Sequence, residues 1–348
     1  MIYTILSIAA SYLSLFFAFV LIIKKNKHIS DYYLAGWLVI LGIYIISLAG
    51  IEQIPKEVEK TVAILHGSFL FIYIKNITYN TRLNPKDLIY FLPFIITMCL
   101  AVFCKSVINT NAYNILSSIV FLAFIVGAII IMRRYNREVK NKYSNIELAD
   151  TAWLNLLIGG NIFFLLNSII ANTIPNFPIN QVEIVAFFIF MTITGLKSIG
   201  SVNFIIHPTA ANEEPEQTSQ QQSSPYTNYG LKDAEAEKLA TKLKEVMLTQ
   251  KLYLNQELSL KSLAESIDTY PHYITQILNS YFKQNFYDFV NQYRIEEAER
   301  MLIDPAKANL TILAIAYECG FNSKATFNRV FKTKNTTTPS QYKQAHLQ

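Results

Sequence analysis

Cysteine and charged residues are scarce in this sequence, and the lack of each removes a class of protein. The three cysteines, Cys99, Cys104 and Cys319, have neither the number nor the spacing of a disulfide framework or a metal site. The long apolar segments contain no paired carboxylates, no cluster of histidine with aspartate and no metal-ligand spacing. The sequence therefore predicts no enzyme, no metal site and no cofactor.

Charged residues make up 16% of the chain, against about 25% in an ordinary soluble domain. Hydrophobic residues reach 52%, and nearly all the long apolar runs lie before His207. The stretch after His207 has the composition of a soluble protein. The net charge of +5 is modest and does not identify a partner. Two domains of different solvent preference are therefore expected.

Apolar segments long enough to cross a bilayer, which takes about 17–25 residues, fill residues 1–206. They predict an all-α, polytopic bundle of about seven transmembrane helices. The first is no cleavable signal peptide, because no basic segment precedes it. The seven are Tyr3–Ile23, Tyr32–Ile51, Thr61–Ile77, Leu88–Cys104, Ala112–Met132, Ala152–Ala171 and Val182–Ile206.

Basic residues flank these segments unevenly. They follow each odd-numbered segment in clusters such as Lys24, Lys25 and Lys27, whereas the loops after even-numbered segments carry few. Because basic loops stay in the cytoplasm, the N-terminus is expected outside and everything after His207 inside. The chain is thus expected to be a multi-pass protein of the bacterial cytoplasmic membrane, with the lipid bilayer as its surroundings.

The outer loops are too short for a soluble sensor domain, so a stimulus must act within the bundle or the bilayer. Polar residues inside the spans are costly and hence candidates for a signal site. We consider His66, Asn161 and Lys197. Each also has a structural interpretation: a lone histidine, an asparagine that bonds a neighbouring helix, and a lysine that reaches the cytoplasmic surface.

Residues 207–230 contain acidic residues, glutamines, serines and prolines with almost nothing apolar, which predicts a disordered linker. Leu231–Gln250 then has the apolar spacing of an amphipathic helix. This helix either packs on the domain that follows or extends toward a dimer partner. Residues 231–348 form the predicted soluble domain.

Two similar helix–turn–helix patterns occur in this domain, at about 258–283 and about 309–334. In the first, Pro271 can begin the second helix. In the second, Gly320 suits the turn and Ser323 can cap the next helix. Phe286–Leu302 lies between them and predicts a longer amphipathic helix that holds the two units apart. Arg294 on this helix is expected to form an ion pair with Glu297.

Residues from about Leu231 to Tyr342 resemble the AraC/XylS family of bacterial transcription regulators. The resemblance is carried by the linking helix Phe286–Ala298 and by three runs: Ile312–Ala316, Cys319–Ser323 and Phe327–Lys332, followed by Thr338–Tyr342. Family members usually have glycine where this chain has Lys283 and Thr336. These residues must either accept a left-handed backbone or end the helix differently.

The resemblance implies a double helix-turn-helix domain that binds double-stranded DNA, with RNA polymerase as a further partner and a homodimer as the assembly. The second helix of each unit enters the major groove. The expected base contacts are His272, Thr275, Gln276 and Asn279 in the first unit and Lys324, Ala325, Asn328 and Arg329 in the second. Lys332 and Lys334 are expected to contact phosphates.

The sequence as a whole predicts a transcription regulator that is embedded in the membrane and binds specific DNA sequences. Such a protein, for example an activator, would couple a signal sensed in the membrane to transcription. The alternative is a transporter or receptor whose cytoplasmic helical domain is a protein-interaction module. Against a transporter, the spans show no internal repeat and no pair of broken helices. Against a membrane enzyme, they lack catalytic constellations.

Overall fold

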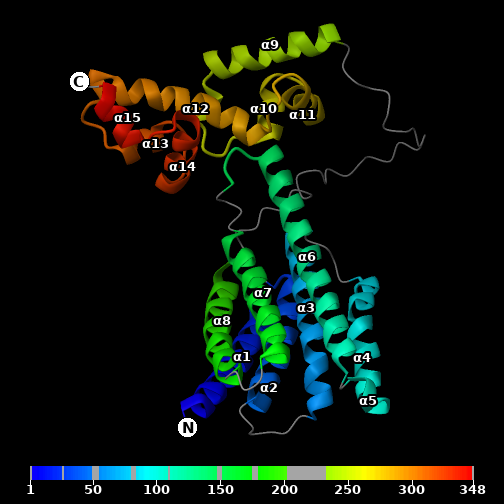
Figure 1. Cartoon of the computed structure of the whole chain (residues 1–348). Helices are drawn as coiled ribbons and strands as arrows, with labels where there is room; N and C mark the ends of the chain where they lie inside the picture. The colour runs from blue at the N-terminus through cyan, green and yellow to red at the C-terminus, as the bar shows by residue number, and fades with distance from the viewer. Residues whose placement is uncertain are drawn as a thin grey trace. The chain divides into compact units, whose positions relative to one another are not determined.

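The computed structural model describes residues 2–25, 27–48, 55–79, 84–108, 110–146, 151–174, 179–201 and 233–346. Within these ranges the chain is helical, and the only strand-like pairing is an isolated bridge between Tyr143 and Ser259. The chain divides into two compact units (Figure 1). The first comprises Met1–Tyr135 and Asp150–Ala211, and the second comprises Asn136–Ala149 and Asn212–Gln348. The predicted linker, 207–230, lies outside the described residues.

The first unit is a helical bundle in which α1 packs on α2 and α8, α2 on α3, and α7 on α8. A short 3-10 helix, η1, leads into α4. The elements are α1 (Ile2–Ile23), α2 (Ile29–Leu48), α3 (Lys56–Tyr79), η1 (Pro85–Phe91), α4 (Leu92–Phe103), α5 (Lys105–Ile108), α6 (Asn111–Lys142), α7 (Ala152–Thr173) and α8 (Ile179–Ser201).

Among the residues that the structure describes, five helical segments are long and apolar enough to cross a membrane. They are Ile2–Ile23, Ile29–Ser47, Pro85–Phe103, Asn111–Lys142 and Ala152–Ile170, and they correspond to the first, second, fourth, fifth and sixth predicted spans. The third predicted span falls in α3 and the seventh, up to Ser201, in α8; these helices are not among the five, and residues 202–206 of the seventh span lie outside the described residues. The all-helical class is confirmed, whereas the number of seven spans stays a prediction.

Helix α6 differs most from its prediction. The apolar run ends at Met132, but the helix continues to Lys142. Its last residues, Asn136–Lys142, belong to the second unit. The extension is rich in lysine, arginine and glutamate, which favour helix, and it follows a helix that is already formed, so each added residue gains a hydrogen bond without a new nucleus.

The second unit contains two cores joined by one long helix, α12. In Figure 1, α10 and α11 lie toward one end of α12, and α13, α14 and α15 toward the other. The elements are α9 (Asp233–Thr249), η4 (Leu252–Leu254), α10 (Leu260–Ser266), α11 (Pro271–Ser280), α12 (Phe286–Ile303), η5 (Pro305–Lys307), α13 (Ile312–Glu318), α14 (Lys324–Asn335) and α15 (Pro339–His346).

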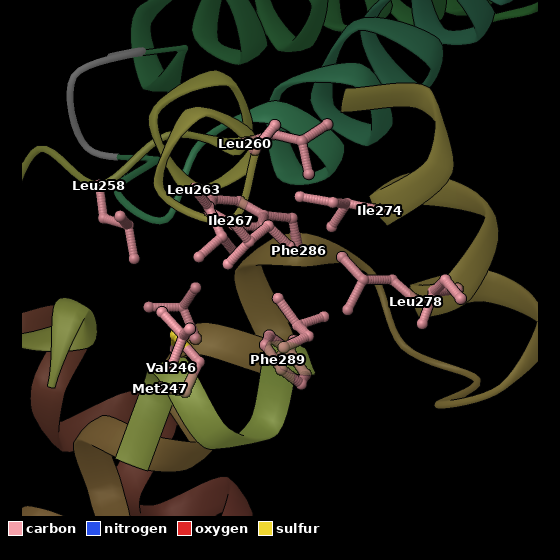
Figure 2. Packing of buried hydrophobic residues seen from close by; sticks show 14 of the residues in the cluster. Val246, Met247, Leu258, Leu260, Leu263, Ile267, Ile274, Leu278, Phe286 and Phe289 are labelled. Carbon is pink, nitrogen blue, oxygen red and sulfur yellow. The ribbon is translucent and has the colours of Figure 1, made fainter. Parts of the chain in front are cut away.

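The first core is formed by α9, α10, α11 and the start of α12 (Figure 2). Leu263, Ile274 and Phe289 point into it, together with Met247 of α9. The described part of the amphipathic helix Leu231–Gln250 is α9, and it buries Leu243 and Met247 here. Of the two interpretations left open by the sequence, the structure thus has this helix packed on its own domain.

The second core joins the end of α12 to α13 and α14. Ile295, Ala298 and Leu302 of α12 face Ile315 and Phe327, both of which are fully buried. Each helix of the two repeats starts where the sequence supplies a start signal. Serine or threonine side chains accept from the first-turn backbone of α10, α13 and α14, and Pro271 begins α11. Such caps each contribute about 1 kcal/mol.

The turns of the two repeats have the same backbone geometry. Asp268 and Gly320 both have positive φ, 53° and 86°. In both turns the next residue, Thr269 or Phe321, donates its backbone N–H to the oxygen of an alanine, Ala264 or Ala316. The left-handed residue ends the first helix and lets the chain reverse toward the second. The predicted role of Gly320 is confirmed.

The two positions that depart from the family pattern also have left-handed backbone, with φ of 56° at Lys283 and 60° at Thr336. Of the two predicted outcomes, a left-handed backbone or a different helix end, the first is correct: both residues adopt the left-handed backbone. Outside glycine, this conformation costs about 1–2 kcal/mol. The cost is offset by the continuation of the chain into α12 and α15.

Gly320 is the glycine of the second unit at which substitution is expected to be most damaging. A Cβ there would lie 2.5 Å from the Tyr253 carbonyl oxygen, in addition to the positive φ. Gly320→Ala is expected to lower the opening free energy of α13 and α14 by about 2–4 kcal/mol. Hydrogen exchange of peptides from residues 312–335, measured on the full-length protein, tests this.

Gly159→Ala is the matched control, because a methyl group there meets nothing within 4 Å. It should leave exchange in residues 312–335 unchanged. Equal exchange in the wild-type protein and Gly320→Ala would contradict the close approach at this turn.

Candidate nucleic-acid interface

Helix α11 presents its polar residues on the side opposite the first core. Ile274, Ile277 and Leu278 are buried, whereas His272 and Asn279 are exposed. Thr275 and Gln276 are half-buried, and the Thr275 hydroxyl donates to the Pro271 carbonyl oxygen at 3.1 Å. His272 stacks on the exposed ring of Tyr270, with ring centroids 5.6 Å apart. All four predicted contact residues of this helix thus retain solvent access.

Helix α14 has the same division of faces. Phe327 and Phe331 are buried, Lys324, Ala325 and Arg329 are exposed, and Asn328 is half-buried. Ser323 caps the helix by accepting from the Thr326 backbone N–H at 3.2 Å. The exposed residues nearest the start of the helix are therefore Lys324 and Ala325. This is the end that a recognition helix presents to base edges.

Arg329 is positioned by a residue that the sequence did not single out. Its guanidinium donates to the hydroxyl of Tyr287 at 3.0 Å. Tyr287 lies on α12 and is buried, and burial raises the pKa of its phenol, so the hydroxyl stays neutral. A neutral partner orients Arg329 but leaves its charge uncompensated. The pairing of a linking-helix tyrosine with a recognition-helix arginine has no local sequence pattern, because the two are far apart in the chain.

The two residues predicted to contact phosphates differ. Lys332 is exposed. Lys334 instead forms an ion pair with Glu296 of α12, 3.0 Å between nitrogen and oxygen, and also donates to the Gln292 carbonyl at 3.3 Å. Asn335 donates to Glu299 at 2.7 Å. These contacts fix the end of α14 to α12, so Lys334 has a structural role, and its phosphate contact stays a prediction.

Arg294 corrects the sequence prediction of an ion pair with Glu297. Glu297 instead pairs with Lys251 at 3.0 Å and Arg300 at 2.7 Å. The Arg294 side chain points into the domain, is 1% exposed and touches no carboxylate of the described residues. Burial lowers the pKa of its guanidinium to about 10, so the group remains charged at neutral pH.

Five hydrogen bonds to oxygen atoms satisfy this buried charge. The guanidinium donates to the carbonyls of Tyr253 at 2.7 Å and Asn255 at 2.8 Å, and to the Asn291 side chain at 3.4 Å. It also donates to the backbone and side-chain oxygens of Ser144, both at 3.1 Å. The Phe321 ring lies 5.8 Å from the guanidinium carbon. Arg294 therefore joins both repeats, α12 and the segment after α6.

The three candidate signal residues occupy separate settings in the first unit. His66 is buried and accepts from the Trp37 indole N–H at 3.1 Å. Asn161 is buried and donates to the Leu157 carbonyl of its own helix at 2.8 Å, rather than to a neighbouring helix. Lys197 is exposed. No contact in the described part of the chain brings the three together.

The three cysteines lie in different surroundings. Cys319 is fully buried in the second core, and burial raises the pKa of its thiol to about 12. Cys99 and Cys104 are exposed, with no disulfide. Among the residues that the structure describes, no group of three histidine, cysteine or acidic side chains could hold a metal ion.

Comparison with known proteins identifies the type of the second unit. Residues 263–345 match a family described as a helix-turn-helix domain of the AraC type. Uncharacterized HTH-type transcriptional regulators of Staphylococcus aureus, strains COL and MSSA476, are 33% identical over 92 residues. The matched stretch is 26% of this chain and 12% of each relative. No solved structure matches the chain. The predicted resemblance to the AraC/XylS family is thus confirmed for the C-terminal domain.

The Arg294 network makes a quantitative prediction. Arg294→Met keeps the length of the side chain but leaves five acceptor oxygens without their donor. Loss of a buried charged partner is expected to lower the opening free energy of the second unit by about 3–5 kcal/mol. Hydrogen exchange in residues 252–258 and 315–321 of the full-length protein measures this.

Arg300→Met is the matched control, since Arg300 lies on the same helix and its ion pair with Glu297 is 61% exposed on the arginine side. An exposed pair contributes about 0–1 kcal/mol. Similar losses for the two variants would refute the central role of Arg294.

Proposed function

We propose that the protein is a membrane-embedded, sequence-specific DNA-binding transcription regulator. One observation carries this proposal: two helix-turn-helix units of matching geometry sit on one rigid helix, each with its polar face open to solvent. The helix-turn-helix family match and the regulator names of the relatives support the DNA-binding part. The five apolar helices support the membrane part.

DNA recognition would use the exposed faces of α11 and α14. Two recognition helices on one side of a domain can enter successive major grooves if they lie about one helical turn, roughly 34 Å, apart. Gln276 and Asn279 can each pair with adenine, and Lys324 and Arg329 with guanine. Ala325 can contact a thymine methyl group. His272, Thr275 and Asn328 complete the base-contacting set, and Lys332 and Lys334 contact phosphates.

The membrane half would hold this reader at the cytoplasmic face of the bacterial membrane. The basic loops after the odd-numbered spans favour that orientation, with the N-terminus outside. DNA, lipid and RNA polymerase are then the expected partners. We propose no enzymatic activity, because DNA recognition alone accounts for the site.

The apolar bundle is the proposed site at which a signal is sensed. A stimulus acting in the bundle, with His66, Asn161 and Lys197 as candidate sites, would change the packing or dimerisation of the helices. Two tethered domains would then meet paired DNA sites at a different effective concentration. The burial of His66 against Trp37 supports this residue more than the exposed Lys197.

The alternative function is that of a transporter or receptor whose cytoplasmic helices bind another protein. It would use the same bundle but would not need the exposed Lys324 and Arg329 of α14. The substitution Arg329→Ala separates the two, because only a regulator depends on this side chain for promoter binding.

For a regulator, Arg329→Ala is expected to weaken binding to its promoter by about 1–3 kcal/mol and to relax the choice of base at one position. The promoter is found by mapping the DNA that the full-length protein occupies in cells, and affinity is then measured on that duplex. The variant should stay in the membrane fraction in wild-type amount.

The control is Arg300→Ala, which removes the same charge from α12 away from the recognition face. Unaltered promoter affinity in Arg329→Ala, or the absence of any occupied promoter, would favour the alternative function. A reporter fused after residue 348 that is active only outside the cell would exclude the proposed orientation.

A further inference from the structure

The segment that follows α6 is built into the DNA-binding unit. Ser144 is 1% exposed, and both its backbone N–H, at 3.2 Å, and its hydroxyl, at 2.6 Å, donate to the Leu258 carbonyl. Its two oxygens accept from Arg294. Tyr143 pairs with Ser259 across an isolated bridge. A loop of the first half of the chain thus completes the interior of the second.

Docking of this segment fixes the last turns of α6 against α12. Lys140 lies over the ring of Tyr287, with 5.8 Å between its nitrogen and the ring centroid. The hydroxyl of the same tyrosine accepts from Arg329. Tyr287 therefore stands between a lysine of α6 and the arginine proposed to read DNA.

A groove of about 470 Å³ opens at this place, lined by Lys140, Tyr287, Asp288, Arg329 and Lys334, among others. Lys334 is paired with Glu296, but neither Lys140 nor Arg329 has an ion-pair partner in the described part of the chain. Asp288 accepts from Asn285 at 2.7 Å in the first turn of α12, where the helix dipole stabilises its charge. Two cations without an ion-pair partner among the described residues thus line one polar groove, together with the Asp288 carboxylate.

The position of the groove beside α14 favours a DNA backbone phosphate as its ligand. It adjoins the exposed face of α14, so a duplex whose major groove receives α14 brings its backbone past Arg329. A phosphodiester carries one negative charge and oxygen acceptors, which suit a lysine and a guanidinium together. A free anion such as pyrophosphate carries the same kind of charge and acceptors, but the neighbouring recognition helix α14 favours DNA as the source of the phosphate.

We propose that Lys140, at the end of α6, contacts a DNA backbone phosphate beside Arg329, whose guanidinium pairs with the adjacent base. The helix that begins as an apolar span thus ends as a part of the DNA-binding surface. This inference rests on the proposed DNA-binding function. Its consequence is that one helix, α6, carries both the fifth predicted span and a phosphate contact, so this contact can be lost without any change in the recognition helices.

The test measures the salt dependence of binding to a labelled 40-bp duplex of random sequence, with full-length protein in phosphatidylcholine nanodiscs between 50 and 200 mM KCl. Each phosphate contact contributes about 0.9 to the slope of log affinity against log salt. Lys140→Gln is expected to reduce that slope by about one and to weaken binding about 5- to 10-fold near 100 mM salt. Lys238→Gln, an equal change of charge on exposed α9, should leave the slope unchanged.

A second variant tests whether the packing of the Ser144 segment against the second unit holds Lys140 at the groove. Ser144→Trp cannot fit the buried site and should release the segment, so it should lower the slope by the same amount as Lys140→Gln. The double variant should lower it no further. Three results would each contradict the phosphate contact of Lys140. They are an unchanged slope in Lys140→Gln, an equal fall in Lys238→Gln, and additive effects in the double variant.

Competition with sodium pyrophosphate at constant ionic strength tests the other source of phosphate. If pyrophosphate binds the wild-type protein in calorimetry and loses this binding in Lys140→Gln, while the DNA slope stays constant, the groove takes a free anion and the proposed ligand is wrong. Failure of the wild-type protein to bind any duplex would instead remove the proposed function itself.

Discussion

Arg294 places a full positive charge inside the C-terminal unit, where only oxygen atoms can stabilise it. Its donors reach the entry to the first repeat at Tyr253 and Asn255, its own helix at Asn291, and the segment after α6 at Ser144. Gly320 of the second repeat must come so close that a Cβ would lie 3.0 Å from the Arg294 Nε. An unpaired buried charge costs several kcal/mol, so the segments that supply the acceptors are held in place unless water takes over as an acceptor.

The acceptors that Arg294 requires explain how two small repeats can keep a fixed position relative to one another. Each recognition helix rests on a core of its own, and neither core is shared between the repeats. Rigidity between them comes from α12, from the Arg294 network and from the contacts of Lys334 and Asn335 with α12. Two grooves of DNA can be read together only if the spacing of the helices is fixed before binding, since flexible spacing would add an entropic cost on association.

The helix-turn-helix units, the start of α11 at Pro271 and the cap at Ser323 could be predicted, because local propensity and apolar spacing specify them. Arg294 was assigned to the wrong partner. An indication was present: Val290, Arg294 and Ala298 recur every four residues, which puts the arginine on the buried face of α12. Its acceptors are mostly backbone carbonyls, which no sequence pattern marks. The docking of Ser144 joins residues 150 positions apart and is likewise invisible in the sequence.

The extension of α6 changes how the two halves of the chain can communicate. If residues 207–230 were the only connection, a signal could act on DNA binding only through proximity of tethered domains. Helix α6 continues to Lys142, and the buried Ser144 that follows provides a second connection along the chain. Because water can replace Ser144 at the guanidinium while the carbonyls of Tyr253 and Asn255 remain, this connection can be released without exposing an unsatisfied charge. Arg294 can therefore both stabilise the reader and permit α6 to move, which a purely apolar contact at the same place would do only by leaving a cavity.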